Sequence, residues 1–106
     1  MASPEEFQRL DLRIGKVLEA KDHDRADRLL ILTVDLGTER RQVVAGIRAA
    51  YQPEQLVGRL VILVANLDSA VIRGVESQGM VLATQDEGGL VLLTTDRSVP
   101  PGNQVK

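Results

Sequence analysis

Residues 76–79 are polar or small and interrupt an apolar stretch between residues 72 and 84 of the 106-residue chain. Together with Met80 at their edge, they are called the polar corner below. Ser77 supplies a rotatable hydroxyl, Gln78 an amide that both donates and accepts, and Met80 a soft apolar surface. Gly79 has no Cβ, so another backbone can come close to it. These side chains suit contact with a sugar-phosphate backbone. They suit a plain turn equally well, with Ser77 bonded locally and Met80 in the core.

Positive charge must supply most of the affinity for any nucleic acid, because phosphate contacts release counterions. The formal net charge of the chain is -2, so that affinity has to come from a local patch. The candidate cations are Arg28, Arg40, Arg41, Arg48, Arg59 and Arg73. Arg41, in a predicted hairpin, and Arg73, just before the polar corner, are the first choices. For any single arginine, a solvated surface role is the commoner outcome.

The residue types argue against catalysis. The chain has no Cys, which removes thiolate chemistry, disulfides and sulfur-ligated metals. The stretch 74–79 resembles a nucleophile elbow, but its first glycine lies one residue too far from Ser77. The only His, His23, lies in a charged loop, where we expect it to be solvated. Three aspartates in that loop lack the Gly and distal Glu of a calcium site. We predict no catalytic residue, metal or cofactor.

Short strands must position these residues. Apolar periodicity predicts strands at 12–18, 29–36, 41–45 and 60–65, followed by a hairpin that pairs 80–83 with 90–93. Pro53 and Gly58 frame a short helix between the third and fourth strands. Gly15 predicts a bulge or sharp bend in the first strand. Near the end of the chain, 99–102 reads as a loop and Val105 as a residue that pairs at a sheet edge.

Five short strands, with a bent first strand and a helix between strands three and four, predict an all-β fold. The pattern matches a Greek-key barrel of the oligonucleotide/oligosaccharide-binding type, the OB-fold. Closure into a barrel hides sheet edges that would otherwise invite aggregation. The alternation of apolar residues alone does not exclude a small β-sandwich. Asn66, at the end of the fourth strand, either caps a turn or presents its amide at the barrel mouth.

Length and composition bound the remaining classes. The chain fits one domain, residues 1–106. No apolar run reaches the roughly 20 residues of a membrane span, and no signal peptide is visible, so we expect a cytoplasmic protein without membrane contact. Phe7 and Tyr51 are the only aromatic residues, which disfavours binding of single strands by base stacking.

Seven segments resemble, in order, the tRNA-binding domain family: FQRLDLRIGKVLEA, ADRLLILTVDLG, VVAGI, YQPEQLVGR, VILVANL, IRGVESQGMVLA and VPPG. The resemblance covers about 7–105. That family includes stand-alone bacterial tRNA-binding proteins, the C-terminal extension of many methionyl-tRNA synthetases, eukaryotic synthetase-associated cofactors and a bacterial export chaperone. It implies the same barrel, dimeric through elements outside it, that holds tRNA without catalysis. It also implies tRNA contact at Ser77 and Met80, and a basic place at Arg28.

We therefore expect a homodimer that binds folded tRNA by shape and phosphate backbone. The expected contact residues are Arg28, Arg41, Asn66, Arg73, Ser77, Gln78 and Met80. We expect the dimer interface in 7–12 and 90–105, where apolar side chains exceed what a small barrel needs.

Three protein contexts stay open. A stand-alone protein is expected first, because the chain begins with Met and covers one domain. The alternative is the C-terminal dimerisation and tRNA-docking domain of methionyl-tRNA synthetase, a ligase; an aminoacyl-tRNA synthetase would then be its partner. An export chaperone that binds unfolded polypeptide is less favoured, because 76–80 resembles the tRNA-binding branch.

Overall fold

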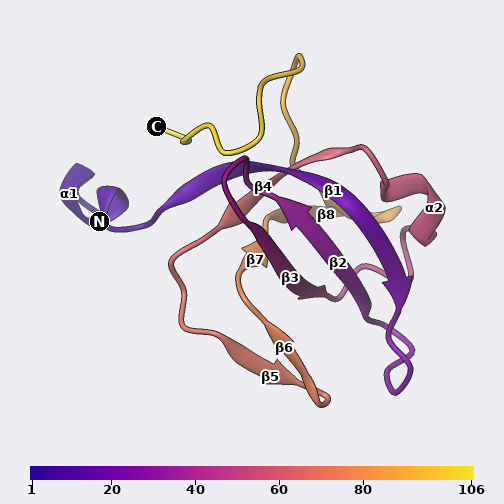
Figure 1. Cartoon of the computed structure of the whole chain (residues 1–106). Coiled ribbons are helices and arrows are strands. Elements are labelled where there is room, and N and C mark those ends of the chain that lie inside the picture. Colours follow the sequence, from indigo (N-terminus) through magenta and orange to yellow (C-terminus); the bar gives the residue numbers. More distant parts are fainter.

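The computed structural model describes all 106 residues and is built around one antiparallel five-stranded sheet (Figure 1). Its strands are β1 (Leu12–Asp22), β2 (Leu30–Asp35), β3 (Arg40–Ala45), β4 (Leu60–Val64) and β7 (Met80–Val81). Two ribbons pair β5 (Ala70–Ile72) with β6 (Val75–Ser77), and β8 (Ala83–Asp86) with β9 (Gly89–Leu92). The helices are α1 (Pro4–Gln8) and α2 (Pro53–Leu56).

The spatial order of the large sheet is β3-β2-β1-β4-β7, in which β1 pairs with both β2 and β4. A meander whose next strand returns beside the first is a Greek key. The sheet curls until β3 contacts β6 and β7, so the barrel is nearly closed. With α2 between β3 and β4, the predicted OB-fold barrel is confirmed.

Aliphatic side chains fill the barrel. Along β2 and its end, Leu30, Leu32, Val34 and Leu36 are all buried, as the alternation predicts. α2 contributes Leu56, which is also fully buried. Full burial of a Val or Leu side chain stabilises a fold by about 1.5–3 kcal/mol. The core is therefore mainly aliphatic, and Tyr51 is the one aromatic residue packed against it.

Of the two features predicted at Gly15, a bulge or a sharp bend, the bulge lies elsewhere in β1. Gly15 pairs regularly with Val61 of β4, and the register of β1 with β2 shifts between Val17 and Glu19 instead. A Cβ on Gly15 would lie 2.3 Å from Cγ1 of Val34. Gly15 therefore leaves room for a neighbouring side chain, which is a tertiary constraint that periodicity does not reveal.

The C-terminal residues run beside the first half of β1, so both ends of the chain lie on the same side of the molecule (Figure 1). The Val105 N–H donates to the Leu12 carbonyl at 2.7 Å, and the Ile14 N–H donates to the Asn103 carbonyl at 2.8 Å. The predicted edge pairing of Val105 is confirmed. None of the helices is both long and apolar enough to cross a membrane.

Candidate nucleic-acid interface

Ser77 lies at the end of β6 and is only 4% exposed. Its hydroxyl accepts a hydrogen bond from the Val44 N–H at 3.0 Å and donates one to the Gly79 carbonyl at 3.1 Å. Both functions of the hydroxyl are therefore used inside the chain. Ser77 shapes the polar corner from within.

The corner closes the barrel against β3. The Gln78 N–H donates to the Gln42 carbonyl at 2.7 Å, and the Gln42 N–H donates to Oε1 of Gln78 at 3.1 Å. Nε2 of Gln42 also donates to the Glu76 carbonyl at 2.8 Å. Side-chain oxygens of Ser77 and Gln78 thus satisfy backbone N–H groups of β3 that a regular strand neighbour would satisfy with carbonyls.

Gly79 lets the backbone of the polar corner pack closely against β4. Its φ of 149° lies in a region that other residues rarely adopt, and a Cβ there would lie 3.0 Å from Cδ1 of Leu63 and from the Val64 carbonyl oxygen. Met80 follows, pairs with Val64 and is 49% exposed. The side chain of Met80 is therefore at the surface, which rules out the plain-core interpretation for this residue.

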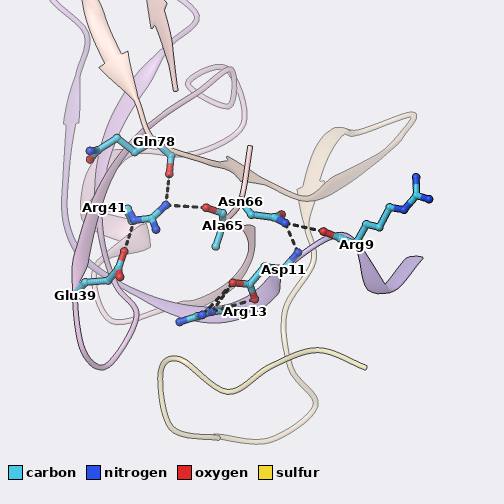
Figure 2. Close-up of polar contacts among 8 residues, drawn as sticks. All are labelled: Arg9, Asp11, Arg13, Glu39, Arg41, Ala65, Asn66 and Gln78. Atoms are coloured by element: carbon cyan, nitrogen blue, oxygen red, sulfur yellow. Dashed lines mark hydrogen bonds and ion pairs between the residues drawn. The ribbon is translucent and has the colours of Figure 1, made fainter. Parts of the chain in front are cut away.

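Arg41 is bound inside the same corner. Its Nη1 donates to the Ala65 carbonyl at 2.8 Å and to the Gln78 carbonyl at 3.1 Å (Figure 2). Its Nε forms an ion pair with Glu39. The guanidinium joins the ends of β4 and β6 to β3, and its charge is balanced locally.

Asn66 connects the N-terminal segment to the barrel. Its Nδ2 donates to the Arg9 carbonyl at 2.6 Å, and its Oδ1 accepts from the Asp11 N–H at 2.8 Å (Figure 2). Asp11 also pairs with Arg13 at 2.9 Å. The hydrogen bond and the charge of Asp11 raise the pKa of Arg13 above its usual value. Asn66 therefore caps the segment between α1 and β1.

The other predicted cations differ in whether they already have a partner within the chain. Arg48 pairs with Asp22 at 3.1 Å, and the Arg59 guanidinium carbon lies 5.8 Å from the centre of the Tyr51 ring. Arg28 and Arg73 are exposed and take part in none of the three ion pairs of the chain. The structure therefore leaves Arg28 and Arg73 available to an anion, in addition to the exposed Arg40.

The expectation that His23 is solvated is wrong, because the imidazole is only 3% exposed. Nδ1 accepts from the Arg25 N–H at 3.0 Å, and Nε2 lies 3.3 Å from the Ile72 carbonyl oxygen. In the tautomer with its proton on Nε2, the ring satisfies both contacts. The β5–β6 ribbon contacts the loop through Ile72. The local sequence around His23 does not predict this contact, because the two residues are far apart in the chain.

The fold gathers no group of three or more His, Asp or Glu side chains that could hold a metal ion. Among the predicted contact residues, three kinds of group remain at least partly accessible. They are the exposed Met80, the amide of Gln78, and the unpaired guanidinium groups of Arg28 and Arg73.

Residues 12–104 match the family model described as "Putative tRNA binding domain". The methionine-tRNA ligase of Thermococcus kodakarensis is 49% identical over 102 residues, which are 96% of this chain and 14% of that protein. The curated relatives are much longer, and this chain spans 14 to 16% of their length.

Two solved structures share the whole fold. A MetRS-related protein from Pyrococcus horikoshii superposes with a TM-score of 0.93 at 36% identity, over 100% of this chain and 98% of that one. The chaperone CsaA from Bacillus anthracis str. Ames gives a TM-score of 0.90 at 32% identity, over 100% and 99%.

Proposed function

This chain belongs to the tRNA-binding domain family, and from that premise we propose that it binds folded tRNA without catalysing a reaction. The observation that carries the proposal is the family match along almost the whole chain. Binding relies on shape and on phosphate contacts, because the chain has only two aromatic residues on which bases could stack.

We assign direct contact to Arg28, Arg73 and Met80, which are exposed, and to the partly exposed Gln78, whose Oε1 accepts from Gln42 but whose amide nitrogen forms no hydrogen bond within the chain. Met80 supplies an exposed apolar side chain, and the arginines supply charge. Ser77, Arg41 and Asn66 support the surface without touching the RNA, because their polar groups are bonded within the chain. They fix the position of the surface that meets the RNA.

We propose that two copies of the chain associate through 7–12 and 90–105. α1 buries none of its residues, and Phe7 stays 44% exposed. A hollow of about 360 Å³ separates α1 from residues 104–106, and Val91 and Leu93 are exposed on and just after β9. A second copy would cover these apolar side chains. Pairing also doubles a small cationic surface, and the second contact gains from effective concentration.

The same domain can serve alone or within a longer protein. The relatives named methionine-tRNA ligase favour a role as a tRNA-docking and dimerisation domain of a methionyl-tRNA synthetase, in the cytoplasm where translation takes place. Catalytic sequence upstream in the encoded protein would identify that form. Its absence from the complete reading frame would identify the stand-alone form.

A second candidate function is chaperone-like binding of unfolded polypeptide, which the likeness to CsaA favours. Filter binding of bulk tRNA and of an unfolded polypeptide, each at two salt concentrations, separates the two. We expect tRNA binding that collapses as salt rises, because phosphate contacts dominate it. Salt-insensitive binding of the polypeptide, without tRNA binding, would overturn the proposal in favour of the chaperone.

Met80→Ala is the matched test of the contact surface. Loss of its apolar contact should weaken tRNA binding roughly five-fold, corresponding to about 1 kcal/mol. Val57→Ala is the control, because Val57 is 55% exposed beside α2 and outside the proposed surface. Equal affinities of the two variants and the parent would show that Met80 makes no contact.

A further inference from the structure

The turn of the β5–β6 ribbon contains an unexpected residue. Ile72 pairs with Val75, so Arg73 and Gly74 form a two-residue turn with φ values of 52° and 85°. Positive φ at both positions is the type I′ geometry, for which Asn-Gly is the preferred sequence. Arg73 is the only residue other than Gly with positive φ in the chain. Turn formation does not explain why Arg stands there, and strained residues of this kind concentrate at functional sites.

A second arginine lies against this turn. Nη1 of Arg25, from the loop between β1 and β2, lies 3.6 Å from the position that a Cβ on Gly74 would occupy. Neither Arg25 nor Arg73 belongs to an ion pair. One arginine therefore belongs to this turn and a second lies against it, and neither is paired with a carboxylate. An anion that contacted both guanidinium groups would pair with both charges at once.

The buried imidazole of His23 sets this arrangement. One ring nitrogen accepts from the backbone N–H of Arg25, and the other faces the carbonyl of Ile72, the residue before Arg73. A single side chain therefore holds the backbone at Arg25 and next to Arg73. The acidic residues of the loop do not neutralise the pair: Asp22 bonds to Arg48, and Asp24 and Asp27 are exposed without an ion pair.

We propose that Arg25 and Arg73 form a clamp for one phosphate group of the RNA backbone, with His23 as a positioning residue. This inference rests on the proposed function and adds Arg25, which the sequence analysis did not select. Guanidinium groups suit the role because their planar donors bind phosphate oxygens in pairs. The ribbon extends from the barrel (Figure 1) and ends at Ser77, so the clamp and the Met80 surface lie at its two ends.

The test measures tRNA affinity across a range of salt concentrations for the parent, Arg25→Gln, Arg73→Asn and the double variant. Each single variant should bind several-fold more weakly, and the slope of log K against log salt should fall by about 0.7–0.9, the contribution of one phosphate. The double variant should lose no more slope than either single one, because both arginines hold the same phosphate.

Two features guard against loss of folding. Asn is the preferred residue at this turn position, so Arg73→Asn should melt at the same or a higher temperature while binding less tRNA. Lys16→Gln removes one exposed charge from the middle of β1 and should leave the slope unchanged. Single variants that bind like the parent, or a double variant that loses two phosphate contacts, would overturn the clamp.

Inorganic phosphate provides a probe that does not depend on RNA. Titration should shift the amide resonances of 23–25 and 72–74 in the parent but not in Arg73→Asn. No shift in a parent that still binds tRNA overturns the clamp alone. Phosphate shifts without tRNA binding overturn the proposed function and leave a phosphate clamp for another ligand.

The positioning role of His23 has its own readout. His23→Asn keeps an oxygen that can accept from the N–H two residues on, as in an Asx-turn. His23→Leu retains bulk but has no acceptor. We expect the salt slope of His23→Asn to stay near that of the parent and the slope of His23→Leu to match that of Arg25→Gln. Equal slopes for the two variants would show that His23 serves folding only.

Discussion

At the scale of single residues, the polar corner differs from a simple ligand-binding lip in how its donors and acceptors are used. Ser77 and Arg41 carry the functional groups most suited to RNA, yet both are bonded to backbone groups of this chain. Met80, the least polar member, is the one that is presented to solvent. Substitution of the buried members should therefore change stability first and binding only through the shape of the corner.

Ser77→Ala tests this assignment. The variant leaves the Val44 N–H buried without an acceptor, which should lower the free energy of unfolding by about 1–3 kcal/mol. Urea denaturation measures the change, and Ser69→Ala at an exposed site is the control, with an expected change near zero. If Ser77→Ala were as stable as the control, the hydroxyl would not be part of the barrel closure.

At the scale of elements, close approach between strands decides where glycine is required. β1 passes so near β2 that the side chain of Val34 occupies the space above Gly15. The barrel is therefore tight at this point, while the bulge that helps β1 to coil lies further along, beside Glu19. The two functions that a strand glycine can serve, bending and close packing, are separated in this strand.

Gly15→Ala should accordingly destabilise the barrel by about 1–3 kcal/mol, the usual cost of overpacking a filled core. Gly46→Ala is the matched control. A Cβ on Gly46 would meet only Cδ2 of Leu29, at 3.8 Å, and Gly46 has no positive φ. Thermal melting should separate the two variants clearly. Equal melting temperatures would mean that β2 moves aside without cost.

At the scale of the whole molecule, the exposed apolar residues of α1 and β9 lie outside the barrel, where they stabilise nothing in a single copy. The barrel core does not include them. The proposed association of two copies would cover them, and it would let a chain with a net charge of -2 present two local cationic surfaces to one polyanion.

Phe7→Ser tests the association. Sedimentation at micromolar concentration should show a dimer for the parent and a monomer for the variant, because the variant loses its largest apolar contact. The affinity for tRNA should fall by about 10²-fold as the second contact is lost. Val57→Ser is the control for an exposed apolar residue elsewhere and should remain dimeric. A parent that sediments only as a monomer would contradict the assembly.

Local patterns predicted the elements well, and long-range contacts explain what they missed. The first four strands of the barrel and α2 follow from alternation and from Pro53, and the family follows from seven ordered segments. Alternation did not predict β5 and β6, and the predicted hairpin of 80–83 with 90–93 is only partly right, because 80–81 pairs with β4 while 83–86 pairs with 89–92. His23 and Arg25 could not be placed, because their surroundings come from a ribbon about 50 residues further along the chain, as the pairing of His23 with Ile72 shows. The residues next to His23 are charged, so the local sequence does not predict that its side chain is buried.

The pairing of the C-terminal residues with β1 also affects how the chain is made. During synthesis β1 leaves the ribosome early, but Leu12 and Ile14 receive their last backbone partners only when 102–105 have emerged. Contacts between such distant segments slow folding, and strands that are still unpaired are prone to aggregation. The first strand of the nascent chain therefore lacks part of its backbone pairing until residues 102–105 have been translated.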